Sequence, residues 1–413
     1  MKWDNLVSYL KGFIKWAVLA VLVGAILGPI GGIFGIALNK ITAVRESHSW
    51  LLYTLPALGA VIAALYHGGR QVGGGSTNAV FTAVRDGRLM PLRTAPLIFA
   101  ATLLTHLGGG SSGREGAALQ IGGSIGGKIG QLLKLDELDC RIMTMIGMSA
   151  GFSAIFGTPL AAAVFTLEVI DVGHVMYMAL FPCLLAALVG VWISGLMGLA
   201  PTAFTLTVTA EATPAVLCRV VILGVLLAGL SIVFCELMHN TPKLLSRLVP
   251  NDYLRAVCGG VIVILLTLVC GTTDYNGAGG SVIAAAVAGT AVPAAFLLKM
   301  LFTAVTLGSG YKGGEIVPIF FTGAAFGCVA APLLGLPAEL GAAIGMVALF
   351  CGATNAPLAS ILLAAELFGG KCLPLFAAAC AVSYMVSGYF SLYAEQKIVF
   401  SKISMEVIDK KLG

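Results

Sequence analysis

The chain has 413 residues, of which 58% are hydrophobic and only 10% are charged, and its formal net charge is +5. Soluble domains carry about 25% charged residues because their surface faces water. This composition excludes an ordinary soluble protein. The small, scattered positive charge, with no basic stripe among aromatic residues, excludes a nucleic-acid-binding protein. We expect an all-α integral membrane protein with lipid as its main surroundings.

The N-terminal residues 1–14 mix charged and apolar side chains, which predicts a cytoplasmic, interfacial helix. Basic residues lie near both ends of the chain: Lys2, Lys11, Lys15, Lys397, Lys402, Lys410 and Lys411. By the positive-inside rule, we expect both termini on the cytoplasmic side of the cell membrane. No small-residue cleavage site follows the first residues, so no removable signal peptide is expected.

Several apolar segments are long enough to cross the hydrocarbon core, which takes about 20 helical residues. They include residues 17–38, 175–200 and 220–235. The rest of the sequence is almost as apolar but is interrupted by glycine and proline, so hydropathy alone does not give the number of spans. The 10 cysteines are scattered singly without metal-ligand spacing, and we expect small buried side chains.

Three glycine-rich segments interrupt the apolar sequence, at residues 73–78, 113–117 and 313–318. Each can present free backbone N–H groups at the start of a helix, where the helix dipole attracts anions. Inside a membrane, non-helical backbone is tolerated only where it lines a cavity or is packed in protein. Structural hinges are the alternative, but three such breaks favour an anion site.

Side chains in these segments are candidates for gating and anion binding. Glu115 carries a carboxylate, which can occupy an anion site and leave it on protonation. Ser76 offers a hydroxyl donor and Asn78 an amide donor. The alternatives are a helix cap paired with Arg114 for the glutamate and ordinary N-capping for the other two residues.

An internal repeat is the most informative feature of the sequence. Residues 147–170 align without a gap with residues 345–368, at a constant offset of 198. A Pro-Leu-Ala triplet and a single glutamate stand in register in both copies, at Pro159, Glu168, Pro357 and Glu366. Bias toward glycine and alanine does not produce such matches. The same offset places residues 113–117 beside residues 311–315.

The repeat divides the chain into a first transmembrane repeat, residues 15–204, and a second, residues 205–395. The polar stretch 202–214 connects them, and residues 396–413 form a cytoplasmic tail. In transporters built from two repeats, the site lies at the repeat interface near the midplane, on discontinuous helices. We expect the same here.

Three charged residues lie in strongly apolar surroundings, Glu168, Glu366 and Lys299. A charge at the bilayer centre costs about 2.5–3.5 kcal/mol on insertion scales. Each residue therefore needs a partner, a wet cavity or a place near the membrane interface. The sequence does not decide whether any of them takes part in proton transfer.

An intramembrane enzyme is the competing class of function. It requires a nucleophile with a base or a set of metal ligands, and the 5 histidines show no ligand spacing. His106 alone lies near the proposed site. We therefore expect no catalytic centre, metal or cofactor.

With these motifs, the chain resembles the CLC family of chloride channels and chloride/proton antiporters along essentially its whole length. The glycine-rich segment that begins at Gly113 is similar to the family's G-R/K-E-G-P motif, with Ala117 in place of proline. The other similar segments are Gly75–Ala79, Phe156–Ala161, Gly314–Pro318 and Thr354–Ala359, and Tyr393 matches the family's late tyrosine.

The resemblance implies a CLC-type fold of two inverted-topology repeats with many tilted and discontinuous helices. It also implies a homodimer with one pathway in each subunit. In that pattern Glu115 is the gating glutamate, and Ser76 and Tyr393 supply hydroxyl groups. The anion is then surrounded by the backbone amides of Glu115, Gly116, Glu315 and Ile316.

Two departures from the family pattern affect the mechanism. Val169 stands where proton-coupled members carry an inner glutamate, and Glu315 is similar to a glutamate of the fluoride-exporting branch. That branch has methionine in place of Ser76 and an asparagine that matches Asn78. We expect chloride/proton antiport gated by Glu115, with Glu315 as a second proton site. A fluoride/proton antiporter and a passive voltage-dependent chloride channel are the alternatives.

Overall fold

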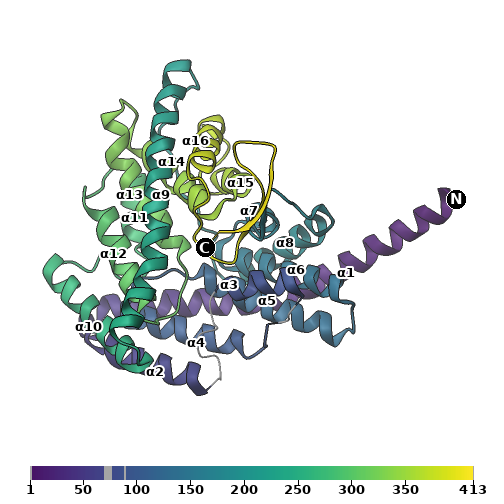
Figure 1. Cartoon of the computed structure of the whole chain (residues 1–413), viewed down its shortest axis with the longest axis horizontal. Helices are drawn as coiled ribbons and strands as arrows, with labels where there is room; N and C mark the ends of the chain where they lie inside the picture. Colours follow the sequence, from purple (N-terminus) through teal and green to yellow (C-terminus); the bar gives the residue numbers. More distant parts are fainter. Residues whose placement is uncertain (1, 69–76, 88–89, 413) are drawn as a thin grey trace.

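The computed structural model describes residues 2–68, 77–87 and 90–412, which are almost entirely helical (Figure 1). The helices before residue 205 are α1 (Lys2–Ser47), α2 (Leu55–Gly68), α3 (Thr77–Asp86), α4 (Thr94–Leu107), α5 (Glu115–Leu132), α6 (Glu137–Phe156), α7 (Pro159–Glu168) and α8 (Leu180–Leu196), with 3-10 turns at Ser49–Thr54 and Tyr177–Ala179. The later helices are α9 (Pro214–Leu248), α10 (Asp252–Cys270), α11 (Gly280–Val287), α12 (Ala295–Gly308), α13 (Ile316–Leu333), α14 (Ala338–Thr354), α15 (Pro357–Phe368) and α16 (Leu373–Val386).

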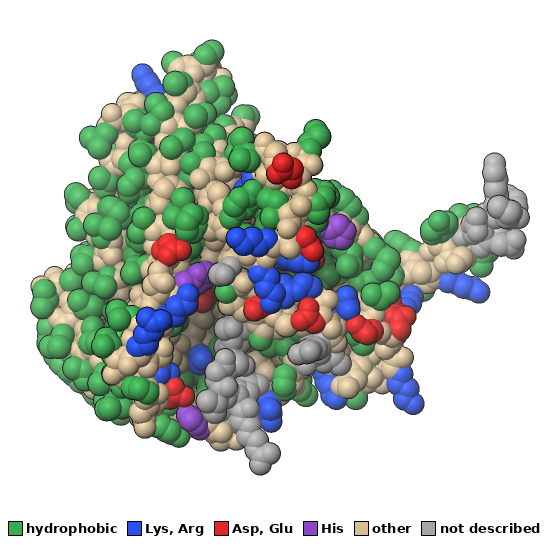
Figure 2. Space-filling view, viewed as in Figure 1, with side chains coloured by type: hydrophobic (Ala, Val, Ile, Leu, Met, Phe, Trp, Pro, Cys, Tyr) green, Lys and Arg blue, Asp and Glu red, His purple; other side chains and the backbone are tan. Residues whose placement is uncertain are grey.

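Within the described residues, 6 helical segments are long and apolar enough to cross a membrane: Leu6–Ser47, Ser49–Gly68, Tyr177–Leu196, Pro214–Leu248, Asp252–Cys270 and Ile316–Leu333. The other apolar helices are shorter, as in a fold with discontinuous helices. The prediction of an all-α membrane protein with interrupted helices is confirmed. The surface view in Figure 2 shows hydrophobic side chains over the outer helices and charged side chains gathered around the C-terminal strands.

The helix pairs α5–α6 and α13–α14 are packed so closely that only glycine fits between them. A Cβ added to Gly147 in α6 would lie 2.1 Å from the carbonyl oxygen of Gly122 in α5. A Cβ added to Gly345 in α14 would lie 2.0 Å from the carbonyl oxygen of Gly323 in α13. Such contact between backbones is the usual way for helices to associate in lipid, where burial of apolar side chains gives little driving force.

The offset of 198 residues predicted for the repeat holds for only part of it. α7 and α15 begin 198 residues apart, whereas α5 and α13 begin 201 residues apart, at Glu115 and Ile316. The difference arises in α6, which has 20 residues against 17 in α14. The prediction that placed Glu315 opposite Ala117 was therefore wrong, because Glu315 caps α13 at the position that Arg114 occupies before α5.

The two intramembrane glutamates brace α7 and α15 against each other. The carboxylate of Glu168, at the end of α7, accepts hydrogen bonds of 3.1 and 2.8 Å from backbone N–H groups in the first turn of α15. The carboxylate of Glu366, near the end of α15, accepts bonds of 2.8 and 2.9 Å from the first turn of α7. Each charge therefore rests on the positive end of a helix dipole, which supplies the partner that a charge in lipid needs.

Lys299 is fully buried and holds a loop in place. Its ammonium donates to the carbonyl oxygens of Tyr275 and Gly277 at 3.1 and 2.7 Å. It also lies 5.1 Å from the centre of the Phe321 ring. This side chain therefore stabilises the turn between α10 and α11.

The residues after α16 supply two strands of a small three-stranded sheet, and the third strand lies between α7 and α8. β1 (Asp171–Val172) pairs in parallel with β2 (Lys397–Phe400), which pairs antiparallel with β3 (Val407–Lys411). Just before β2, the buried amide of Gln396 donates to the carbonyl oxygen of Val169 at 2.8 Å and accepts from the hydroxyl of Ser391 at 2.6 Å. These bonds fix the loop that carries Tyr393.

The glycine contacts give a direct test of the packing. Gly147→Ala or Gly345→Ala places a methyl group against backbone and should lower the free energy of unfolding by about 1–3 kcal/mol. Gly229→Ala is the matched control, because nothing lies within 4 Å of a Cβ there, and it should be neutral or slightly stabilising. Thermal unfolding in detergent measures all three. Equal stability of the three variants would contradict the close packing.

Candidate functional site

A short backbone bridge joins the two halves of the chain at the centre of the site. The N–H of Gly113 donates to the carbonyl oxygen of Gly314 at 2.6 Å, and the N–H of Gly314 donates back at 2.8 Å. Helices α5 and α13 begin within two residues of this bridge. Their N-termini, with the free N–H groups of their first turns, therefore meet at one place.

Glu115 lies between these two helix N-termini and is only 1% exposed. Its Oε2 accepts hydrogen bonds from the N–H groups of Arg114 at 3.0 Å and Val317 at 3.4 Å. The second of these belongs to the first turn of α13. The carboxylate therefore takes the position in which helix N-termini bind anions.

Several buried oxygen atoms around this point have no hydrogen-bond partner among the described residues, and three of them belong to residues that the sequence identified. They are Oε1 of Glu115, Oε2 of Glu315 and the hydroxyl of Tyr393, all of them buried. The hydroxyl of Tyr393 interacts electrostatically with both carboxylates, which interact with each other. The Tyr393 ring is held edge-on against Phe81, with centroids 4.8 Å apart. Buried polar atoms without partners are rare and call for an explanation, which a transient ligand supplies.

Helix α3 contributes a third N-terminus to the site. A Cβ added to Gly116 would lie 2.8 Å from the hydroxyl oxygen of Thr77 and 3.2 Å from the Cα of Gly314. Thr77, the first residue of α3, therefore approaches the start of α5 because Gly116 has no side chain. The predicted donor Ser76, which precedes Thr77, lies outside the described residues.

Asn78 has a structural contact that the sequence did not indicate. Its side-chain oxygen accepts a hydrogen bond of 3.3 Å from the N–H of Glu395. The carboxylate of Glu395 is paired with Arg85 at 3.0 Å and with Lys411 at 2.6 Å. Asn78 therefore helps to hold the loop that places Tyr393.

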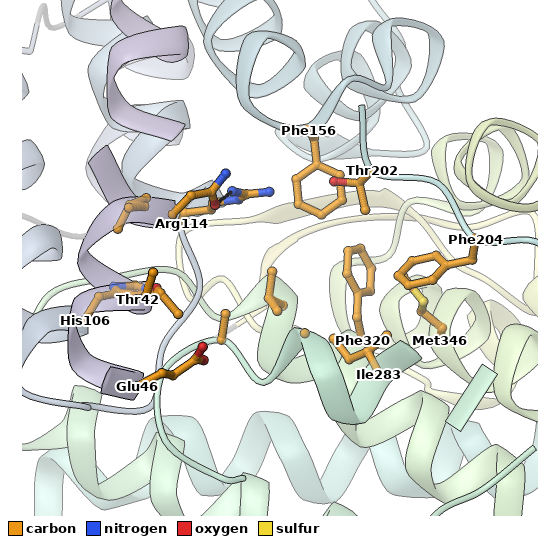
Figure 3. A pocket seen from close by; sticks show the side chains of 16 residues that line it. Thr42, Glu46, His106, Arg114, Phe156, Thr202, Phe204, Ile283, Phe320 and Met346 are labelled. Carbon is orange, nitrogen blue, oxygen red and sulfur yellow. Dashed lines mark hydrogen bonds between the residues drawn. The ribbon is translucent and has the colours of Figure 1, made fainter. Parts of the chain in front are cut away.

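A cavity of about 330 Å³ lies on one side of the site, and Figure 3 shows its lining. We call it the outer cavity; Arg114, Val317 and His106 are among its lining residues. The guanidinium of Arg114 lies 3.9 Å from Oε1 of Glu115 and 5.9 Å from the centre of the Phe156 ring. This positive charge lies next to the free oxygen of the glutamate, and the carboxylate of Glu46 is also part of the cavity lining.

The site combines residues that the sequence identified with residues that it missed. Glu115, Gly116, Glu315, Ile316 and Tyr393 all lie at the convergence of the helix ends. The roles of Thr77, Phe81 and Val317 were missed: they follow from the folded chain, with no sequence signal except that Thr77 follows Ser76. No cluster of three or more metal-binding side chains is present in the described ranges.

Comparisons with known sequences agree with this arrangement. The family model described as voltage gated chloride channel matches residues 58–388. The chloride/fluoride channel protein of Pseudomonas syringae pv. tomato is 38% identical over 94% of this chain and 87% of its own length. The voltage-gated ClC-type chloride channel ClcB of Escherichia coli is 27% identical over 84% of this chain and 87% of its own.

Solved structures show the same fold. A CLC-type fluoride/proton antiporter is similar with a TM-score of 0.90 at 34% identity, over 94% of this chain and 98% of its own. A slow cyanobacterial Cl⁻/H⁺ antiporter has a TM-score of 0.78 at 22% identity, over 90% of this chain and 94% of its own. At that identity the second structure supports the fold alone.

The backbone bridge can be tested without a change in charge. A Cβ on Gly314 would lie 2.7 Å from the N of Gly116, so Gly314→Ala should push the two helix ends apart. We expect a loss of anion flux of about tenfold or more, since small misplacements at a reacting centre cost that much. Gly195→Ala in α8, where nothing lies within 4 Å of a Cβ, is the control and should keep its flux. Full flux in Gly314→Ala liposomes would contradict the site.

Proposed function

We propose, from the premise that this chain belongs to the voltage-gated chloride channel (CLC) family, that it exchanges a halide for protons across a membrane. The observation that carries the proposal is the position of the Glu115 carboxylate, bonded to an N–H group in the first turn of α13 where an anion would bind. Members of this family are channels and transporters, and we propose no enzymatic role for the chain.

The exchange follows from competition for one set of donors. When Glu115 is ionised, its carboxylate holds the N–H groups at the helix ends and excludes a halide. When it takes up a proton, the neutral carboxyl group loses most of its attraction to the helix dipole, and the halide replaces it. The displaced carboxyl group then gives up its proton on the other side. A halide and a proton therefore move in opposite directions in one cycle.

We propose that Glu315 and Tyr393 complete the pathway, together with Ser76, Asn78 and the amides of Gly116 and Ile316. The Tyr393 hydroxyl donates to the anion, which explains why it has no partner within the described part of the chain. Glu315 is a second proton acceptor beside Glu115. This arrangement supports a coupled antiporter over a passive channel, since a channel has no need of two carboxylates at the ion site.

We propose fluoride as the transported halide, with chloride, the expectation from the sequence, as the alternative. Two observations support fluoride. The relatives whose names include fluoride are 38% and 34% identical to this chain, against 27% and 22% for the chloride relatives. A protonated carboxyl group at Glu315 is also a short O–H donor, and fluoride, the smallest halide, accepts the strongest hydrogen bonds from such donors.

We propose that both termini lie in the cytoplasm and that the chain resides in the cell membrane. In the first turn of α6, Asp139 pairs with Lys15 of α1. A cavity of about 250 Å³ joins Arg141, in the same region of α6, to Asp171, which pairs with Lys397 of the C-terminal sheet. The two ends of the chain are therefore on one side, and their basic residues favour the cytoplasm.

We also propose the division into repeats at residues 15–204 and 205–395, and a homodimer with a complete pathway in each subunit. The repeats are supported by the matching helix pairs, and the self-contained pathway by a site built wholly from one chain. The dimer itself is the expectation from the family resemblance.

Glu115→Gln tests the proposed exchange. The glutamine mimics the protonated carboxyl group, so the variant should conduct the halide passively while it loses proton coupling. The measurement is flux from purified protein in liposomes, with fluoride, chloride and protons recorded separately. In the wild-type protein, a halide gradient should drive protons in the direction opposite to the halide. This exchange should be faster with fluoride than with chloride.

Two results would contradict this proposal. Proton uptake driven by a halide gradient in Glu115→Gln liposomes would remove Glu115 from the proton pathway. Halide flux without protons in the wild-type protein would favour the passive channel. Glu211→Gln, at an exposed glutamate in the connection before α9, is the control and should behave as the wild type.

A further inference from the structure

A second cavity lies beside the loop that leads to α13 and is lined by Lys312 of that loop. We call it the α2–α10 cleft; its volume is about 220 Å³, and its polar lining includes Tyr66, His67, Asp252, Arg255 and Lys312. α1 runs from the side of Lys15 to the side of the outer cavity, and α2 returns. The cleft lies at the C-terminal end of α2 and therefore on the side of the chain termini.

The entrance of the cleft is formed by a pair of titratable side chains in contact with water. Nε2 of His67 lies 3.1 Å from Oδ2 of Asp252, and the two side chains are 39% and 35% exposed. Arg255 pairs with the same carboxylate. A histidine ring has two nitrogen atoms, so it can accept a proton on one and release a proton from the other.

The cleft reaches the loop that ends at Glu315, through Lys312. The ammonium of Lys312 lies 4.5 Å from the centre of the Tyr66 ring and interacts electrostatically with Asp252 at the entrance and with Glu315 at the site. The hydroxyl of Tyr66 is buried and has no partner among the described residues. Three residues after Lys312, Oε2 of Glu315 is also buried and unpartnered.

We infer that the α2–α10 cleft is the route by which protons from the cytoplasm reach Glu315, separately from the halide. The inference rests on the proposed halide/proton exchange. At about 30 Å³ for each water molecule, the cleft holds a short chain of water. A proton passes along this water and the Tyr66 hydroxyl to the Glu315 carboxylate, which becomes a carboxyl group. Glu315 then gives the proton to the Glu115 carboxylate and is ionised again.

The charges of the cleft favour protons over halides. Carboxylates stand at both ends, Asp252 at the entrance and Glu315 at the inner end, and they repel an anion. Arg255 is occupied by Asp252. Lys312 interacts electrostatically with both carboxylates, and its positive charge stabilises the ionised form of Glu315. The chloride/proton antiporters that this chain resembles carry a glutamate at the position of Val169. The cleft provides a proton route on the cytoplasmic side that does not need a carboxyl group at that position.

A steric block tests the route without removal of a titratable group. Ala63 lines the cleft, so Ala63→Phe fills it and expels the water. Ala64→Phe, the next residue of α2, is exposed and is the matched control. In liposomes, Ala63→Phe should slow coupled proton and halide exchange by about tenfold or more, the usual cost of a lost proton-transfer path. Ala64→Phe should exchange at the wild-type rate.

The Glu115→Gln background separates the two ion routes. There the passive halide flux needs no proton, so the addition of Ala63→Phe should leave it unchanged. Normal exchange in Ala63→Phe overturns the inference, and so does an equal loss of passive halide flux in the double variant, because the cleft would then carry the halide. A wild-type protein that moves a halide without protons overturns both the inference and the proposed function.

Lys312→Met provides a second variant if the phenylalanine prevents folding. It removes the charge between the two carboxylates and keeps most of the side-chain length, so coupled exchange should slow while passive flux in the Glu115→Gln background persists. Lys243→Met, an exposed lysine near the end of α9, is the control. Wild-type exchange in Lys312→Met would count against the route.

Discussion

The structure depends on one backbone contact, the pair of hydrogen bonds between Gly113 and Gly314. In lipid, an interrupted helix exposes donors that no water can satisfy, and each costs several kcal/mol. Two interrupted helices that meet end to end share this cost, because the loops before them bond to each other. The N–H groups of Arg114 and Val317, one from each helix end, both donate to the Glu115 carboxylate. Glycine is required at the bridge and at Gly116, since a side chain there would separate the helix ends.

Carboxylates accept hydrogen bonds at helix N-termini in three places, and two of them are bonded through both oxygens whereas the third is bonded through one. Glu168 and Glu366 use both oxygens to hold the first turns of α15 and α7. Glu115 uses only Oε2, in bonds of 3.0 and 3.4 Å, and Oε1 accepts none from the described residues. A carboxylate held by half of its acceptors is easier to displace. The same physical interaction thus braces the fold in two places, and in the third we propose that it serves as a gate.

Much of the fold followed from the sequence because its signals are local or repeated. The composition predicted lipid, the glycine-rich breaks predicted interrupted helices, and the Pro-Leu-Ala triplets predicted the matching starts of α7 and α15. The three-residue shift between α5 and α13 was missed, since it depends on the longer α6, which no motif marks. The braces of Glu168 and Glu366 were also missed, because they join residues about 190–206 positions apart in the chain.

In the site, the sequence identified side chains with distinctive chemistry, such as Glu115, Glu315 and Tyr393, but could not identify backbone donors or neighbours. Val317 contributes only an N–H group, and any residue but proline has one. Thr77 and Phe81 become relevant because α3 packs against α5 and the C-terminal loop. The α2–α10 cleft is invisible in the sequence, since it joins α2, α10 and the loop before α13.

The central claim is that a halide and the Glu115 carboxylate compete for the same helix ends. The most direct test is calorimetric titration of the purified protein with fluoride and chloride in buffers of different ionisation enthalpy, which counts the protons taken up as each anion binds. The account predicts that the wild-type protein takes up protons with the anion and that Glu115→Gln binds the anion with no proton uptake. Equal proton uptake by the two proteins would contradict it. An anion affinity that is the same in the wild-type protein and in Glu115→Gln would also contradict it.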